Sequence, residues 1–209
     1  MTPYYQEGGI TIYHGDCREI VPQLPLADLV LTDPPYGINL TRQFMPKGSQ
    51  KCNIFGDDEP FNPLHLLGRG ACVIWGANNF ADRLPPGGWL CWDKRCNEAA
   101  DRMHGSPFEL AWSSDQSKLK MYRIMHGGVV NADGWGYGRY HPTQKPISLM
   151  AAIIKDFKCN SVCDPYMGSG TTLIAAKRLG VSAIGIEIEE RYCEIAAKRL
   201  SQGVLELTA

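Results

Sequence analysis

The chain has 209 residues, of which 44% are hydrophobic and 21% charged, a composition typical of one soluble globular domain. Its 21 Lys and Arg residues against 22 Asp and Glu residues give a net charge of −1, so overall charge provides no argument for a nucleic-acid partner. No apolar run approaches the roughly 18 residues of a membrane span and no signal peptide is visible, so we expect a cytoplasmic protein. The eight cysteines form no C-x-x-C pair, and no metal site is expected.

Short apolar runs alternate with helical patterns along the chain, which predicts an α/β fold. The expected strands are residues 10–13, 29–32, 71–75, 89–92, 108–112, 121–125, 161–163 and 183–188. The expected helices are residues 147–157, 171–179 and 190–200. The second helix stops before Gly180, a residue typical of the position after a helix end.

The predicted strand 29–32 runs directly into Asp33, Pro34, Pro35 and Tyr36. The two prolines stiffen the backbone and remove two N–H donors, which presents a carboxylate, free carbonyls and an aromatic ring at the carboxyl edge of a parallel sheet. These groups suit a planar ring that bears an amino group, because Asp33 and the Pro34 carbonyl can accept its two hydrogens while Tyr36 stacks on the ring. Accepting both hydrogens draws the nitrogen lone pair out of conjugation, so the nitrogen can attack a methyl group. The alternative is a proline-rich turn beside an ordinary surface aspartate.

Two long segments have the composition of loops. Residues 37–63 are rich in glycine and proline, and residues 113–140 form a second irregular stretch in which basic residues outnumber acidic ones. Loops of such length inside a domain are usually functional, although a solvated polar surface would have the same composition.

A glycine-rich turn follows the predicted strand 161–163, which ends at Asp164. Gly168 and Gly170 allow the backbone to approach a ligand, and the helix that follows supplies N–H donors. The next strand delivers Glu187 to the place where doubly wound folds bind ribose hydroxyls. The turn lacks the Walker and dinucleotide signatures, and Asp164 favours a cationic or zwitterionic ligand such as S-adenosylmethionine. The alternative is that the glycines only make a tight turn from strand to helix.

Together these motifs resemble the amino-methylating DNA methyltransferases. Asp33-Pro34-Pro35-Tyr36 resembles their catalytic motif, residues 164–170 resemble their cofactor motif, and residues 141–146 resemble the block that precedes it. The order of the motifs is similar to that of the permuted β class. The resemblance implies a single Rossmann-like, S-adenosylmethionine-dependent methyltransferase domain over residues 1–209. It further implies a mostly parallel, seven-stranded sheet with helices on both faces and a circularly permuted motif order.

The resemblance also implies roles for individual residues. Asp33, Pro34, Pro35 and Tyr36 would hold the target base. The cofactor residues would be Asp16, Cys17, Asp33, Thr143, Lys145, Asp164, Pro165, Tyr166, Gly168, Gly170, Thr171 and Glu187. Within that set, Glu187 would hold the ribose, while Thr143 and Lys145 would contact the methionine carboxylate region. Asp16 would accept from the adenine amine, unless it only caps the turn that follows.

An aspartate in front of the two prolines resembles the adenine-N6 enzymes, whereas the related cytosine-N4 enzymes tend to carry serine there. Cytosine-N4 methylation of DNA, adenine methylation of RNA and a catalytically inactive nucleic-acid-binding relative are the alternatives. Strands 89–92 and 108–112 fall where the family builds the rest of its base pocket, so Trp92 and Trp112 either stack on the base or belong to the core.

The resemblance implies double-stranded DNA as partner, a possible homodimer, and a prokaryotic or phage origin such as a restriction-modification system. Because the chain has little room for a target-recognition region, we expect a short or relaxed target site, with segments 37–63 and 113–140 touching DNA. The basic residues expected to contact DNA are Arg42, Lys47, Lys51, Lys94, Lys118, Lys120, Arg123 and Arg139.

Overall fold

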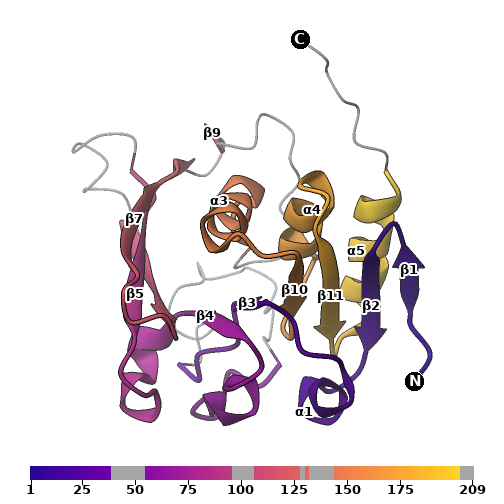
Figure 1. Cartoon of the computed structure of the whole chain (residues 1–209), viewed down its shortest axis with the longest axis horizontal. Coiled ribbons are helices and arrows are strands. Elements are labelled where there is room, and N and C mark those ends of the chain that lie inside the picture. The colour runs from indigo at the N-terminus through magenta and orange to yellow at the C-terminus, as the bar shows by residue number, and fades with distance from the viewer. Residues whose placement is uncertain (39–54, 96–105, 128–129, 132–143, 203–209) are drawn as a thin grey trace, which may run out of the picture.

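The computed structural model describes residues 1–38, 55–95, 106–127, 130–131 and 144–202. The strands of its main sheet are β1 (Tyr5–Glu7), β2 (Ile10–His14), β3 (Leu29–Thr32), β4 (Ala71–Trp75), β5 (Gly88–Asp93), β6 (Phe108–Ser113), β7 (Leu119–Arg123), β10 (Ser161–Asp164) and β11 (Ser182–Glu187). They lie in the order β1-β2-β11-β10-β3-β4-β6-β5-β7 (Figure 1). Two further short strands, β8 (His126–Gly127) and β9 (Val130–Asn131), form a separate two-stranded sheet within the described residues.

The sheet is mostly parallel, as expected. Strands β2, β11, β10, β3 and β4 are parallel neighbours, while β6 runs antiparallel to both β4 and β5. Since the carboxyl ends of parallel strands meet at one edge, β3 and β10 deliver the residues that follow them to the same place. This parallel pairing positions the site described below.

The expected count of seven strands is wrong, because the described part of the chain contributes nine to this sheet. All eight predicted strands are in it, and β1 is the ninth. β1 pairs antiparallel with β2 across Gly8 and Gly9, whose positive φ angles suit a two-residue hairpin turn. β1 is mostly exposed, so it carries no hydrophobic signal. β7 begins and ends two residues earlier than predicted, because only Tyr122 of this edge strand is buried.

Side chains of alternating direction cover both faces of the sheet. Leu29 and Leu31 of β3 pack with the helices α3 (Ile147–Phe157), α4 (Thr171–Arg178) and α5 (Glu190–Ser201) in one core cluster. Val30 points to the opposite face, where shorter elements pack: 3-10 turns and the helix α1 (Cys17–Ile20). Helices on both faces are therefore confirmed, with the long ones on one face only.

The three predicted helices form at or within one residue of the expected ends. Gly180 adopts a φ of 68°, and its amide donates to the Lys177 carbonyl at 3.1 Å, which closes the end of α4. Within the described ranges, no helix has the length and apolar character needed to cross a membrane.

The tryptophans of the central strands belong to the core. Trp75, Trp92 and Trp112 are at most 2% exposed, and Trp75 meets Trp92 edge to face with ring centres 6.3 Å apart. The indole N–H of Trp92 donates to the Ile124 carbonyl and that of Trp112 to the Pro85 carbonyl. Because these rings are enclosed and hydrogen-bonded, Trp92 and Trp112 are not stacking surfaces for a base.

Candidate active site

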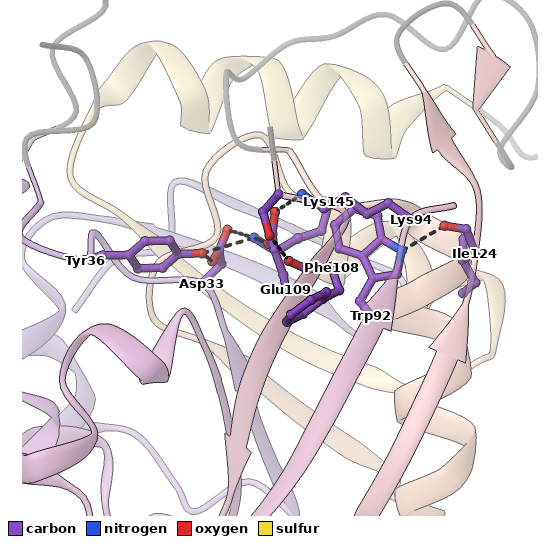
Figure 2. Close-up of polar contacts among 9 residues, drawn as sticks. Asp33, Tyr36, Trp92, Lys94, Phe108, Glu109, Ile124 and Lys145 are labelled. Carbon is purple, nitrogen blue, oxygen red and sulfur yellow. Dashed lines mark hydrogen bonds and ion pairs between the residues drawn. The ribbon is translucent and has the colours of Figure 1, made fainter. Parts of the chain in front are cut away.

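Asp33 follows β3 directly, and both of its carboxylate oxygens accept hydrogen bonds. The Tyr36 hydroxyl donates to Oδ1 at 2.6 Å, and the Lys145 ammonium donates to Oδ2 at 2.5 Å (Figure 2). Lys145 lies 112 residues further along the chain, two residues before the start of α3. The fold therefore brings the Asp-Pro-Pro-Tyr motif into contact with the block 141–146, which precedes the cofactor motif in the sequence.

Lys145 is shared between two acidic side chains. Its Nζ lies 3.1 Å from Oε2 of Glu109, on β6, as well as 2.5 Å from Asp33, and only 4% of its side chain is exposed. Glu109 in turn accepts from Lys94 through Oε1 at 2.5 Å. Figure 2 shows Asp33, Lys145, Glu109 and Lys94 as an array of alternating charges. We call these four residues the charged array.

The sequence gives Glu109 no role of its own. Lys145 was expected near the methionine end of the cofactor and Lys94 on DNA, and both contacts stay predictions. The structure adds a carboxylate partner for each ammonium group beside the catalytic motif. The antiparallel pairing of β5 with β6 sets Trp92 opposite Glu109, so Lys94 comes within reach of that carboxylate. No local pattern signals such a long-range pair.

The charges of the array control one another's pKa values. Burial would lower the pKa of Lys145, but Asp33 and Glu109 outweigh burial and hold it well above its ordinary value. Burial would raise the pKa of Glu109, but Lys145 and Lys94 bring it down to about 2. Burial raises the pKa of Asp33, and Lys145 offsets only part of this effect. Lys145 and Glu109 are therefore both charged at neutral pH.

Two residues outside the motif hold the Tyr36 turn in place. Gly76 follows β4 with a φ of 69°, and a Cβ added there would overlap the Tyr36 ring. Asp57, which is 5% exposed, accepts from the backbone amides of Gly37 at 2.9 Å and Ile38 at 3.3 Å. Neither residue was given a role from the sequence. Asp57 looked like one member of an acidic run.

The glycine turn that resembles the cofactor motif lies at the end of β10. Asp164 is 4% exposed and accepts from the Thr32 hydroxyl at 2.7 Å and from the Tyr166 amide at 3.2 Å. Burial raises its pKa to about 6, although hydrogen bonds from Thr172 and Thr32 act in the opposite direction. Gly168 and Gly170 have φ angles of 52° and 82°, which glycine adopts without strain. The turn leads into α4 through Thr171, which is also buried.

Glu187, the last residue of β11, lies across this turn. Its Oε2 accepts from the Gly168 amide at 3.0 Å and its Oε1 accepts from the Glu189 amide at 2.8 Å. Burial raises the pKa of Glu187, and both backbone amides oppose that rise. The structure thus brings Asp164, the glycine turn and Glu187 together, as the sequence predicts.

The Asp16-Cys17 pair reaches the same region from α1. Asp16 caps this helix by accepting from the Arg18 amide at 2.9 Å, so the capping role considered above is present. The Cys17 thiol lies 3.7 Å from Nε2 of His65, and the Tyr166 hydroxyl lies 3.0 Å from the same nitrogen. His65 is a residue that sequence reasoning missed.

The other predicted residues divide into two groups. Thr143, Arg42, Lys47, Lys51 and Arg139 lie outside the described residues. Lys118, Lys120 and Arg123 lie on or beside β7, where Lys120 bonds Asp156 and Arg123 lies 3.7 Å from Asp93. Their contact with DNA stays a prediction.

In the parallel part of the sheet, Asp33 follows β3, the glycine turn follows the neighbouring β10, and Glu187 ends β11. This arrangement is typical of a Rossmann-like group-transfer site for a nucleoside cofactor. Comparison with known proteins narrows this class. A family profile described as DNA methylase, for the N6 and N4 methyltransferases, matches residues 74–198. The chain is 51% identical to the type II methyltransferase M2.LlaDCHI of Lactococcus lactis subsp. cremoris, over 96% of this chain and 93% of that protein. It therefore belongs to the N6/N4 DNA methylase family.

More distant relatives agree with this assignment. The type II methyltransferase M.ScaI of Streptomyces caespitosus is 25% identical over 95% of this chain and 83% of its own length. The crystal structure of the M1.HpyAVI–SAM complex matches with a TM-score of 0.55 at 26% identity, covering 91% of this chain and 99% of that one. The cytosine-N4-specific PvuII DNA methyltransferase matches with a TM-score of 0.66 at 15% identity, covering 97% and 90%. This last likeness concerns the fold alone.

Proposed function

We propose that this protein transfers a methyl group from S-adenosylmethionine to the exocyclic N6 of adenine in DNA. The general activity, S-adenosylmethionine-dependent methylation of DNA at an unspecified base, follows from membership of the family. The proposal concerns the base and the residues that act on it. Asp33 is the observation that carries it, because an aspartate rather than a serine precedes the two prolines.

The surroundings of Asp33 support its role as acceptor for an amino group. A carboxylate accepts hydrogen bonds best when it is ionised, and Lys145 supplies the positive charge that makes ionisation possible in a buried place. Each oxygen has a second lone pair, so Asp33 can accept from the target amine beside Tyr36 and Lys145. With the Pro34 carbonyl taking the other hydrogen, the amine lone pair becomes available for attack.

The cofactor residues fit a sulfonium-bearing nucleoside. S-adenosylmethionine supplies an electrophilic methyl group when it is bound. The residues around the described turn include two carboxylates, the buried Asp164 and the half-buried Glu187, which suit an ammonium group and ribose hydroxyls. Glu187 is already oriented by two backbone amides, so its carboxylate is held in place. Pro165, Tyr166, Gly168, Gly170 and Thr171 would complete the binding turn.

Nucleoside analysis tests the choice of base. The protein is incubated with S-adenosylmethionine and unmethylated bacterial genomic DNA, and the DNA is digested to nucleosides. We expect N6-methyladenine in the wild-type reaction and none with Asp33→Asn, which keeps the shape of the side chain but removes its charge. Asp156→Asn is the matched control, because Asp156 bonds Lys120 and Tyr122 outside the site.

The same assay separates the alternatives. N4-methylcytosine in the product would replace the proposal by cytosine-N4 methylation, and N6-methyladenine only in an RNA substrate would replace DNA by RNA. Complete absence of methyl transfer would favour an inactive nucleic-acid-binding relative. Equal activity of wild type and Asp33→Asn would refute the catalytic assignment.

Further features of this proposal concern target choice and assembly. We infer a short or relaxed target site in double-stranded DNA, read by segments 37–63 and 113–140. We also infer a cytoplasmic enzyme of a prokaryote or phage. A homodimer stays a prediction. Single-molecule mapping of modified adenines in DNA from expressing cells tests the target. One long motif, methylated to completion and nowhere else, would contradict a relaxed site.

A further inference from the structure

The charged array beside the catalytic motif contains more charge than is needed to hold Asp33 in place. Lys145 would be sufficient as the counter-ion of Asp33. Its Nζ is nevertheless also 3.1 Å from Glu109, and Glu109 is itself 2.5 Å from Lys94. Glu109 lies on β6, and Lys94 is the residue that follows β5. Because Lys145 is buried, water screens these interactions only weakly.

Glu109 and Asp33 compete for one ammonium group. A carboxylate that shares its counter-ion is a stronger hydrogen-bond acceptor than one that holds the counter-ion alone. Removal of the Glu109 charge would leave Lys145 to Asp33 alone and weaken Asp33 as an acceptor. Removal of the Lys94 charge would have the opposite effect, because Glu109 would then attract Lys145 more strongly.

We propose that Glu109 is a positioning residue that draws Lys145 partly away from Asp33, so that Asp33 can accept the hydrogens of the target amine, and that Lys94 limits this effect. The inference rests on the proposed function, since it takes Asp33 as the group that meets the amine. It adds two residues to the machinery, of which one had no assigned role and the other was expected to contact DNA.

The electrostatics of the described groups agree with this competition. Burial is the main cause that raises the pKa of Asp33; Lys145 lowers it and Glu109 raises it again. Tyr36, on the turn after β3, donates a hydrogen bond to Asp33, and the charge of Asp33 also raises the pKa of Asp164 at the end of β10. Glu109 has a pKa of about 2 despite burial, because two ammonium groups face it, so it acts as a constant negative charge in the working pH range.

The test compares Glu109→Gln with Lys94→Gln. Single-turnover rates of methyl transfer to unmethylated genomic DNA are measured with saturating S-adenosylmethionine from about pH 5 to about pH 8. We expect the plateau rate of Glu109→Gln to fall about ten- to hundredfold. Its acid limb should move to lower pH by about one unit, since the pKa of Asp33 falls. The acid limb of Lys94→Gln should move to higher pH.

The opposite directions distinguish positioning from loss of structure. A merely structural role for either residue would lower the rate without moving the two acid limbs in opposite directions, and that result would overturn the inference. Glu194→Gln and Lys198→Gln remove the members of an exposed pair on α5 and should leave the profile unchanged.

Failure of the proposed function would look different. In that case wild type would transfer no methyl to adenine in DNA, or Asp33→Asn would equal wild type. An active wild type, an inactive Asp33→Asn and unmoved acid limbs in both array variants would overturn the role of Glu109 alone. Binding of S-adenosylmethionine by each variant verifies that it is folded.

Discussion

The hydroxyl of Thr32 donates a buried hydrogen bond of 2.7 Å to Oδ1 of Asp164, across 132 residues of sequence. Thr32 immediately precedes Asp33, and Asp164 begins the glycine turn, so one bond ties the base motif to the cofactor motif. The bond is possible because β3 and β10 pair in parallel, with Val30 beside Cys163. Methyl transfer requires donor and acceptor within a narrow range of distance, so we expect this bond, together with the strand pairing, to keep the two motifs in place.

Thr32→Val should uncouple the two motifs while preserving the branched shape of the side chain. Loss of the hydroxyl leaves Oδ1 of Asp164 with one donor fewer, so we expect a decrease of about 1 kcal/mol in the free energy of unfolding. The single-turnover rate should fall about tenfold. Urea unfolding and methyl-transfer assays measure both. Thr32→Ser retains the hydroxyl and is the control; equal rates for the two variants would show that the bond does not matter for transfer.

Cofactor affinity should depend on pH through Asp164. Burial raises the pKa of this carboxyl to about 6, and a cationic cofactor binds its ionised form more tightly. We therefore expect the affinity for S-adenosylmethionine to fall by about tenfold between pH 7 and pH 5. Calorimetric titration at several pH values measures this change. In Asp164→Asn the dependence should disappear, and an unchanged slope there would assign it to another group.

The stability of the cofactor-free protein should change in the opposite direction. Because the pKa of Asp164 is raised from 3.8 to about 6 on folding, the folded state binds an extra proton between these two values. Its contribution to the unfolding free energy therefore increases as the pH falls from 7 to 5, by about 1 kcal/mol. Urea unfolding at both pH values, compared with Asp164→Asn, isolates this contribution. A difference of the other sign would refute the burial of an ionisable Asp164.

Gly76→Ala should damage the catalytic motif through Tyr36. The added methyl group would overlap the Tyr36 ring, and the φ of 69° is unfavourable for alanine. We expect destabilisation of about 1–3 kcal/mol and a fall in methyl-transfer rate of about a hundredfold. Gly68→Ala is a matched control, since Gly68 has a φ of 76° but open space around a Cβ. If both variants lost activity equally, backbone strain alone would explain the effect.

His65 should support the cofactor turn through Tyr166. Nδ1 of His65 lies 3.1 Å from the Asn62 carbonyl and donates to it, so Nε2 is the nitrogen that accepts from the Tyr166 hydroxyl. Burial lowers the pKa of His65, which favours this neutral form. We expect His65→Phe and Tyr166→Phe each to weaken S-adenosylmethionine binding.

A double-mutant cycle tests the pair. The coupling free energy between His65→Phe and Tyr166→Phe should be about 1 kcal/mol, because the double variant loses one shared hydrogen bond rather than two independent contacts. Dissociation constants of the four proteins provide this value. Additive losses would mean that the two side chains act on the cofactor separately.

Local patterns predicted most of the fold. β3, β4 and α3 begin and end where expected, because each has a buried apolar pattern and clear flanking residues. The exceptions are exposed: β1 has no buried side chain, and β7 has one. Where a strand buries little, its sequence carries no periodic signal, and pairing with a neighbour alone decides its limits.

The sequence by itself determined where the proposed catalytic and cofactor motifs lie along the chain, since Asp33, Asp164 and Glu187 each follow or end a recognisable strand. Only the tertiary structure decided the partners of these residues. Lys145 meets Asp33 across 112 residues of sequence, Glu109 joins it from β6, and Lys94 joins Glu109 from the residue after β5. Ion pairs form where chain segments are brought together and water is excluded, and those conditions depend on how the strands are arranged in the sheet.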